Sequence, residues 1–220
     1  MKPTKGIYFN FSRLNLNMKS LKLILTNSNY FAPAFVFATL NIVLGTWAIY
    51  IPAIKSRLGI DAGDLGLAIF CMALGTLIMI TLAPKLINLF GVGRVTSSSA
   101  VLFLFSFIIP FSASRYIWLC FGMFVVGLFS GLCDVAMNAL VSEIEKRDKI
   151  HIMSASHGFF SLGGFLGAGI GGLFLAKNIP PIHHLLVVIF ILLIINLALM
   201  RKYFLHNFSS FLNIRQPTSR

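Results

Sequence analysis

Charged side chains are scarce in this sequence: they make up 11% of its 220 residues, and only six of them are acidic. A soluble domain carries about twice that charged fraction. Apolar residues instead account for 57% of the chain, with 22 phenylalanines and a mean hydropathy of +0.88. One small core cannot hide so much apolar surface, so the composition excludes a soluble globular domain and indicates a protein embedded in a bilayer.

The sequence also has few of the patterns on which metal binding or redox chemistry depends. Its three cysteines, Cys71, Cys120 and Cys133, lie inside apolar runs without a Cys-x-x-Cys spacing, as small buried residues do. The adjacent His183 and His184 have no third ligand nearby. We therefore expect no metal and no cofactor.

A nucleophile motif is missing as well. An intramembrane serine protease of the rhomboid type needs Gly-x-Ser-Gly, whereas this chain reads Gly-Leu-Phe-Ser-Gly over residues 127–131, one residue too long. The histidine that would have to serve as the base, His157, lies on the apolar run that directly follows. Those proteases carry their histidine two runs after the serine. The sequence predicts a protein that is not an enzyme.

The formal net charge of +12 first suggests a nucleic-acid partner. The cations do not line a helix face or alternate with aromatic residues, however. They stand in short segments between apolar runs and at the two termini. Charge placed in this way is a topology signal, so we expect the lipid bilayer as the partner and no nucleic acid.

Six apolar runs follow a basic N-terminal segment, each near the length of about 20 residues that crosses hydrocarbon. They do not alternate polar and apolar residues, which favours helices over membrane strands. The sequence predicts an all-α membrane protein, a six-transmembrane-helix bundle over residues 31–200, with basic tails at 1–30 and 201–220. The runs are 31–54, 64–83, 95–111, 116–140, 152–176 and 182–200. The third is the shortest and carries three serines, 97–99, at its start.

The distribution of cations predicts an orientation. With the N-terminus in the cytosol, fourteen of the 18 Lys and Arg residues lie on the cytosolic side and four on the other, as the positive-inside rule demands. The four external cations are Lys55, Arg57, Arg115 and Lys177. We therefore expect a multi-pass protein of the inner (plasma) membrane with both termini in the cytosol.

Asp134 is the one acidic residue in the interior of a predicted span. Ser130 and Asn138 lie one helical turn before and after it, so the three share a helix face. Burying a carboxylate in hydrocarbon costs roughly 2.5–3.5 kcal/mol, so this face should point into the bundle or a water-filled cavity. Asp134 either exchanges a proton or, permanently protonated and hydrogen-bonded, fixes helix packing. Because acids inside membranes usually serve function, the first interpretation is favoured.

Three further residues are candidates for the same cavity. His157 falls early in the fifth run, where its imidazole could contact a substrate, pair with Asp134 or relay a proton. It could equally be hydrogen-bonded to backbone near the membrane surface. Asn41 and Trp47, in the first run, could line the cavity or serve in packing.

Glycines are dense on the fourth and fifth runs. Spacings of four residues place small residues along one helix face, where a second helix can approach closely. The positions are Gly127 and Gly131 on the fourth run, and Gly163, Gly167 and Gly171 on the fifth. They predict tight helix packing.

The Asp-Val-Ala-Met-Asn segment at 134–138 and the His-Gly-Phe-Phe-Ser-Leu-Gly-Gly segment at 157–164 resemble spans four and five of major facilitator superfamily transporters. Trp47 to Leu65, with Ile51-Pro52 near the end of the first run, resembles the same group. The resemblance is to the YbjJ-type inner-membrane group and, more distantly, to sugar/proton symporters of the fucose permease type. It covers about six of the family's twelve spans and implies the N-terminal half of such a transporter.

The resemblance also implies roles. In fucose-type symporters an acid followed by Ala-x-Asn is the proposed proton-coupling group, and Asp134 falls on that position; a polar residue early in span five contacts sugar, and His157 matches it. Those relatives carry an acid in span one, which this chain lacks. The family's Gly-x-x-x-Asp-Arg-x-Gly-Arg gating loop corresponds to 84–94, where Asn88 replaces the aspartate and Gly91 and Arg94 remain.

We therefore expect transport of a small polar solute, secondary active and coupled to protons, by a half-length or truncated transporter, a symporter. A second six-helix half or a second copy of the chain would complete it. The alternative is a non-transporting fragment or a membrane scaffold that pairs with another chain.

Overall fold

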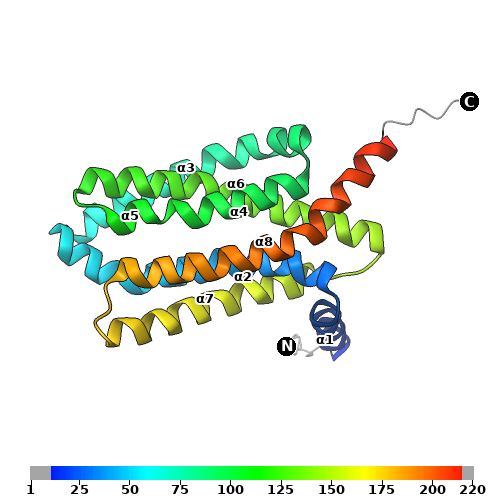
Figure 1. The fold of residues 1–220 in the computed structure, drawn as a ribbon, viewed down its shortest axis with the longest axis horizontal. Coiled ribbons are helices and arrows are strands. Elements are labelled where there is room, and N and C mark those ends of the chain that lie inside the picture. The colour runs from blue at the N-terminus through cyan, green and yellow to red at the C-terminus, as the bar shows by residue number, and fades with distance from the viewer. Residues whose placement is uncertain (1–10, 215–220) are drawn as a thin grey trace, which may run out of the picture.

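The computed structural model describes residues 11–214, which form eight helices and, within that range, no strand. Six of the helical segments are long and apolar enough to cross a membrane. The prediction of an all-α, six-helix membrane bundle is confirmed (Figure 1). The helices are α1 Phe11–Thr26, α2 Ser28–Leu58, α3 Ala62–Phe90, α4 Val92–Ser106, α5 Ile108–Ser112, α6 Tyr116–Asp148, α7 Met153–Ala176 and α8 Pro181–Ile214.

Several helices continue beyond the apolar runs that predicted them. The sequence predicts the fourth run over 116–140, yet α6 extends to Asp148 through a charged segment, and α3 reaches Phe90 instead of residue 83. A helix satisfies its own backbone hydrogen bonds, so it can leave the hydrocarbon without a break. Hydropathy therefore locates the spans but not the helix ends.

The third span is interrupted one residue past the end of α4. Its two segments, α4 and α5, together make a candidate span over Val92–Ser112. Pro110 has no backbone N–H to bond the carbonyl of Ser106, the residue four before it and the last of α4. The missing bond explains why regular α4 stops there and a single short turn, α5, follows.

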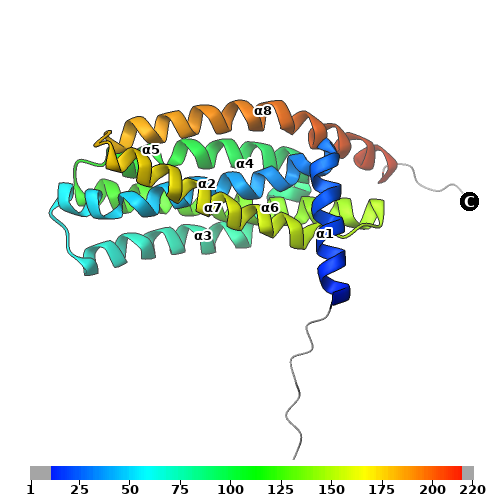
Figure 2. The ribbon, with the colours of Figure 1, turned by 90° about the horizontal axis from the view of Figure 1, so that it is seen from below.

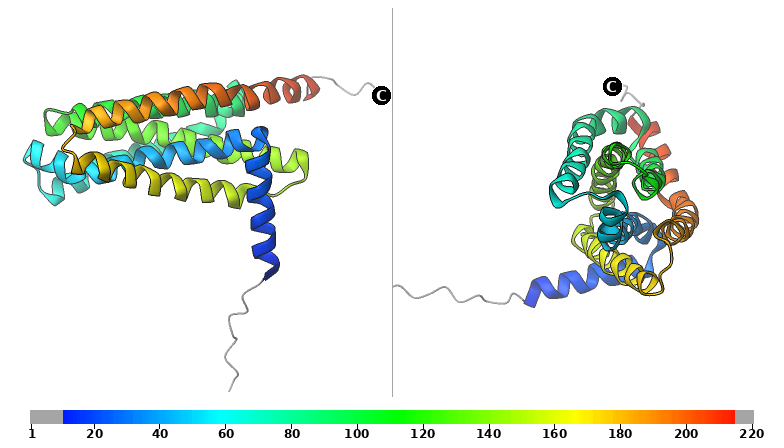
Figure 3. Two further views of the ribbon diagram at one scale, coloured as in Figure 1. Left: turned by 60° about the horizontal axis from the view of Figure 1, so that its bottom comes forward. Right: turned by 90° about the vertical axis from the view of Figure 1, so that its left-hand side faces the viewer.

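The segment at 1–30, which the sequence predicts to be a tail, contains the helix α1. Figures 2 and 3 show α1 roughly perpendicular to the spans, with its C-terminal part against the bundle and its N-terminal part projecting to one side. The Ser20 hydroxyl donates to the His151 carbonyl, and Ile24 is fully buried. The rest of both tails, 1–10 and 215–220, lies outside the described residues.

The spans form two tightly packed pairs, α2 with α7 and α3 with α6. On one side, α4 packs against α6, and α8 packs against α2 and α4. Figure 3 shows this arrangement along the bundle axis: α3 and α7 lie at its edges, with α6 and α2 between them. One side of α2 and α6 is thus covered by α4 and α8.

Glycines lie where the paired helices approach most closely. A Cβ added at Gly167 would meet the Ile42 carbonyl of α2, and one at Gly127 would meet the Met72 carbonyl of α3. Gly163 and Gly131 occupy equivalent places against Ala38 and Thr76. Gly171 differs, because a Cβ there would make only ordinary contacts, the nearest at 3.5 Å.

We call the end of the bundle that holds α1, the α3–α4 and α6–α7 connections and the exit of α8 the basic end (Figure 1). In the described part of the chain, nine cations lie in the connections at the basic end or in the helical turns next to them. They are Lys19, Lys22, Lys85, Arg94, Lys146, Arg147, Lys149, Arg201 and Lys202.

Candidate functional site

Asp134 and Asn138 lie on the face of α6 that points away from the core. Cys133 and Met137, which directly precede Asp134 and Asn138 in the sequence, are fully buried, whereas the side chain of Asp134 is exposed in the described chain. The Asn138 amide donates to the Asp134 backbone carbonyl at 2.8 Å and to its carboxylate Oδ1 at 3.3 Å. Within residues 11–214 the carboxylate of Asp134 forms no ion pair. It is therefore accessible and held in place by one neighbouring amide.

His157 reaches the same side of the bundle from the second turn of α7. Its side chain is exposed, and its ring packs edge-on against Phe37 of α2 with the centroids 5.2 Å apart. The imidazole also interacts electrostatically with the carboxyl group of Asp134. The fold thus brings together two of the predicted residues, from two different spans, on one face.

Asn41 of α2 is half-buried at the contact between α2 and α7. Its partner on α7, Phe160, comes three residues after His157. The Asn41 amide donates to the Phe160 carbonyl at 2.9 Å, and a Cβ added at Gly164 would meet the Asn41 side chain. Asn41 therefore ties α2 to the turn of α7 that follows His157. Its observed contact is with backbone, which positions α7.

Ser130 does not lie on the open face with Asp134, although helical spacing predicts that it should. Its side chain is 8% exposed, its hydroxyl donates to the Gly127 carbonyl at 3.1 Å, and it lies 3.4 Å from the Thr76 hydroxyl of α3. The reason is that α3 crosses α6 at the small residues Gly127 and Gly131 and covers this turn. The predicted polar stripe is reduced to Asp134 and Asn138.

Trp47 also lies in the core. It is 5% exposed, and its indole contacts the rings of Phe107 and Phe111 at centroid distances of 6.2 and 5.5 Å. These contacts fasten α2 to the α4–α5 junction. Of the two interpretations that the sequence leaves open for Trp47, the packing role is the one its contacts support.

The predicted gating loop at 84–94 is almost entirely helical. Asn88 is exposed on the last turn of α3, Arg94 is on the first turn of α4, and only Gly91 separates the two helices. Gly91 has φ of 88°, a conformation that residues with a Cβ rarely adopt. Its N–H bonds the Ile87 carbonyl. The expectation of a loop is corrected to a one-residue junction.

Two buried polar pairs were not among the predicted site residues. The Asn196 amide of α8 donates to the Thr39 hydroxyl of α2 at 2.9 Å, and the Tyr50 hydroxyl lies 3.2 Å from Nδ1 of His184. A polar residue inside an apolar run was the available signal for each. Both join α2 to α8 on the covered side, away from Asp134.

Chemically, the open face offers a carboxyl group, an imidazole and an amide on otherwise apolar helices. The carboxyl and the imidazole can take up and release protons, and the amide can donate and accept hydrogen bonds. No group of three or more potential metal ligands occurs among the residues that the structure describes. Polar groups of this kind are costly against lipid, so the face is suited to an aqueous cavity or to a further layer of protein.

Comparison with known proteins agrees with this arrangement. Residues 31–211 match the model of the Major Facilitator Superfamily. An uncharacterized transporter of Sinorhizobium fredii is 32% identical over 147 residues, which are 67% of this chain and 39% of the relative. An uncharacterized MFS-type transporter of Yersinia pestis is 27% identical over 165 residues, 75% of this chain and 42% of the relative.

The membrane protein MosC of Rhizobium meliloti is 29% identical over 162 residues, 71% of this chain and 40% of that protein. The aligned part of the chain thus spans about two fifths of the length of each of these relatives, in keeping with a resemblance to one half of a transporter. The family match over most of the chain, on a bundle of six spans, shows that it belongs to the major facilitator superfamily.

Proposed function

We propose that this chain forms one half of a secondary active transporter for a small polar solute and that Asp134 is its proton-coupling group. The observation that carries the proposal is the position of Asp134: an acid in the interior of a span, on the face that α4 and α8 leave uncovered, with His157 beside it. A carboxyl group there can alternate between a protonated and an ionised form as a cavity opens and closes.

His157 and Asn138 would contact the solute. Asn138 holds the Asp134 carboxylate through a hydrogen bond that a solute hydroxyl could replace, and His157 approaches from α7. A solute bound between them would touch α6 and α7 together. Protonation of Asp134 would weaken its hydrogen bond from Asn138 and free that amide for the solute, so the proton and the solute would bind together and cross in the same direction.

The faces of α3 and α7 support a further layer of helices. Only 11% of the apolar window of α3 and 22% of that of α7 is buried within this chain. Transporters built from two repeats place their solute site between the repeats. A second six-helix half, or a second copy of the chain, would cover these edges and close the cavity over Asp134.

We also propose that the basic end faces the cytosol and that the membrane is the inner (plasma) membrane. The cations at this end outnumber those at the other, which satisfies the positive-inside rule. The helix α1, which projects sideways from the bundle at this end and is roughly perpendicular to the spans, would then rest on the cytosolic surface. In this proposal the chain works as a symporter and not as an enzyme.

The experiment is solute uptake into proteoliposomes under an inward proton gradient, with a panel of small sugars, sugar acids and amino acids. Asp134→Asn should abolish gradient-driven uptake while exchange of solute across the membrane at equal pH continues, because the amide resembles the protonated acid. Glu143→Gln, an exposed acid on the same helix near the basic end, is the matched control and should transport normally. Gradient-driven uptake by the Asp134→Asn variant would disprove the proton role.

A second candidate is a non-transporting membrane scaffold that pairs with another chain. The exposed apolar edges of α3 and α7 favour it as much as they favour a transporter half. It predicts a complex of defined mass with no flux of any solute in the panel. Exchange of one solute that depends on Asn138 would exclude it.

A further inference from the structure

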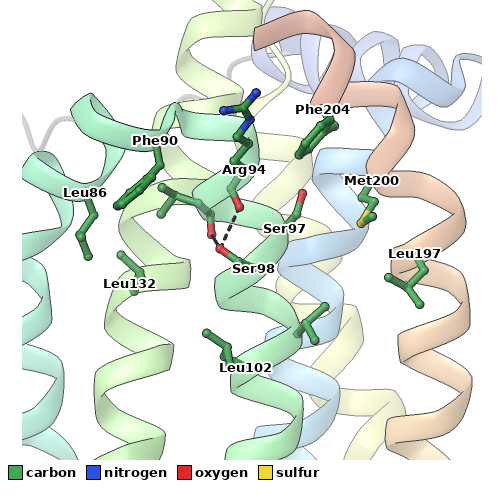
Figure 4. A pocket seen from close by; sticks show the side chains of 12 residues that line it. Leu86, Phe90, Arg94, Ser97, Ser98, Leu102, Leu132, Leu197, Met200 and Phe204 are labelled. Carbon is green, nitrogen blue, oxygen red and sulfur yellow. Dashed lines mark hydrogen bonds between the residues drawn. The ribbon is translucent and has the colours of Figure 1, made fainter. Parts of the chain in front are cut away.

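A groove runs along the outer side of α4, between the end of α3 and α8. Its volume is about 670 Å³, and Figure 4 shows side chains from four helices around it. The ridges on either side are Phe90 of α3 and Met200 of α8, while Leu102 of α4 and Leu132 of α6 form the floor. The groove lies on the opposite side of α6 from Asp134, so the proposed transport site does not use it.

The walls of the groove are apolar, although two serines line it. The Ser97 hydroxyl donates to the Gly93 carbonyl at 2.8 Å, and the Ser98 hydroxyl donates to the Arg94 carbonyl at 2.9 Å, as the dashed line in Figure 4 marks. Both hydroxyls are therefore satisfied by the backbone of their own helix. Below Arg94, the groove therefore offers an occupant an almost entirely apolar surface.

One cation stands at the mouth of the groove. Arg94 is exposed, and its guanidinium lies over the ring of Phe204, 5.5 Å from the centroid. Within the described part of the chain no carboxylate forms an ion pair with Arg94. Figure 4 shows the guanidinium at the open upper edge of the groove and the apolar side chains below it.

The groove also has the right depth in a membrane. Arg94 is on the first turn of a span, at the basic end, and Leu102 is eight residues further along α4. Eight residues of helix rise about 12 Å, which fits within the roughly 15 Å of one hydrocarbon leaflet. The charged mouth therefore lies at the membrane surface and the apolar floor among the lipid tails.

We propose that this groove binds an anionic phospholipid, with one acyl chain along α4 and the headgroup phosphate held by Arg94. A guanidinium binds phosphate through two parallel hydrogen bonds, and the cation–π contact with Phe204 fixes its position for that purpose. The volume falls in the range of about 300–1,000 Å³ found for small-ligand sites. The cation without a carboxylate partner selects an anionic lipid over a zwitterionic one.

The place of binding is tested on the unaltered protein with a phosphatidylglycerol that carries a photoreactive diazirine in one acyl chain. After illumination in vesicles, mass spectrometry of peptides should find the label concentrated on Val101, Leu102 and Leu197. Label spread over the outer faces of α3 and α7 in proportion to their exposure would overturn the proposal, since those faces are apolar but not grooved.

The role of the headgroup is tested by native mass spectrometry of delipidated protein titrated with phosphatidylglycerol or with phosphatidylcholine of the same chains. Arg94→Gln should weaken binding of phosphatidylglycerol about fivefold and leave phosphatidylcholine unchanged. Arg94→Lys should keep the preference for phosphatidylglycerol over phosphatidylcholine. Arg115→Gln, which removes an exposed arginine at the opposite end of the bundle, is the control and should leave the binding of both lipids unchanged.

The role of the acyl chain is tested with Ser98→Trp, which fills the groove and should weaken both lipids equally. Unchanged binding of phosphatidylglycerol by Arg94→Gln or by Ser98→Trp would refute the proposal. Loss of the lipid preference when inorganic phosphate is added at millimolar concentration would assign Arg94 to a free-anion site instead. A doubled particle mass that Ser98→Trp abolishes would assign the groove to a second copy of the chain.

Discussion

The carboxylate of Glu145 near the end of α6 accepts a hydrogen bond from the backbone N–H of Met153, the first residue of α7, at 2.8 Å. It also accepts one from the preceding N–H of Ile152. The first N–H groups of a helix have no partner within it, and a carboxylate is well suited to satisfy them. Glu145 therefore fixes the start of α7, the helix that carries His157, relative to α6, the helix that carries Asp134.

Replacing Glu145 by alanine should destabilise the protein by about 1–2 kcal/mol, the usual loss when a capping side chain is removed. Unfolding of the purified protein in increasing sodium dodecyl sulfate, followed by circular dichroism, measures the change. Glu145→Gln should lose less, because its amide oxygen still accepts. Glu143→Ala on the exposed side of the same turn should lose almost nothing; an equal loss there would show that the cap is not the cause.

The contact between α2 and α7 makes opposite predictions for two glycines of one helix. A Cβ at Gly167 would meet the Ile42 carbonyl, so Gly167→Ala should destabilise by about 1–3 kcal/mol through overpacking. Nothing lies within 4 Å of a Cβ at Gly169, so Gly169→Ala should stabilise α7 by up to about 1 kcal/mol, the difference in helix propensity. The same unfolding titration compares them, and a stable Gly167→Ala variant would contradict the packing seen here.

The buried hydrogen bond between Asn196 and Thr39 should link α8 to α2 energetically. Such bonds inside membrane proteins contribute about 0.6 kcal/mol on average and up to about 1.7 kcal/mol. A double-mutant cycle of Asn196→Leu and Thr39→Val isolates the coupling between them. A coupling energy of zero would mean that the Asn196 amide is served as well by its other acceptor, the Leu192 carbonyl.

Hydropathy was enough to predict the six spans, because each span depends on the composition of a single segment, and the same pattern singles out Asp134 as an acid inside a span. The features that were missed depend on pairs of segments. Helical spacing put Ser130 beside Asp134, but only the crossing of α3 decides that Ser130 is covered. Glu145 reaches the N–H groups of α7 across a turn, with no periodic pattern to reveal it, and α1 lacks the apolar length of a span.

The different surroundings of Ser130 and Asn138 lead to the last prediction, which separates packing from solute contact. Both are small polar residues of α6, one turn on either side of Asp134. Ser130 packs against Thr76, so Ser130→Ala should lower stability by about 0.5–1.5 kcal/mol, the net value of a hydrogen bond, with KM unchanged. Asn138 is half-buried on the open face, and its amide bonds Asp134 of the same helix, so Asn138→Ala should leave stability within about 0.5 kcal/mol, as substitutions away from the core do, and raise KM severalfold.

Uptake kinetics and the unfolding titration on the same two variants make the comparison, because each variant controls for the other. If Ser130→Ala raised KM while Asn138→Ala only lowered stability, the solute would have to enter between α3 and α6. That result would place the cavity on the covered side of Ser130 and would separate it from Asp134. The expected pattern instead ties the solute to the face that Asp134, Asn138 and His157 share.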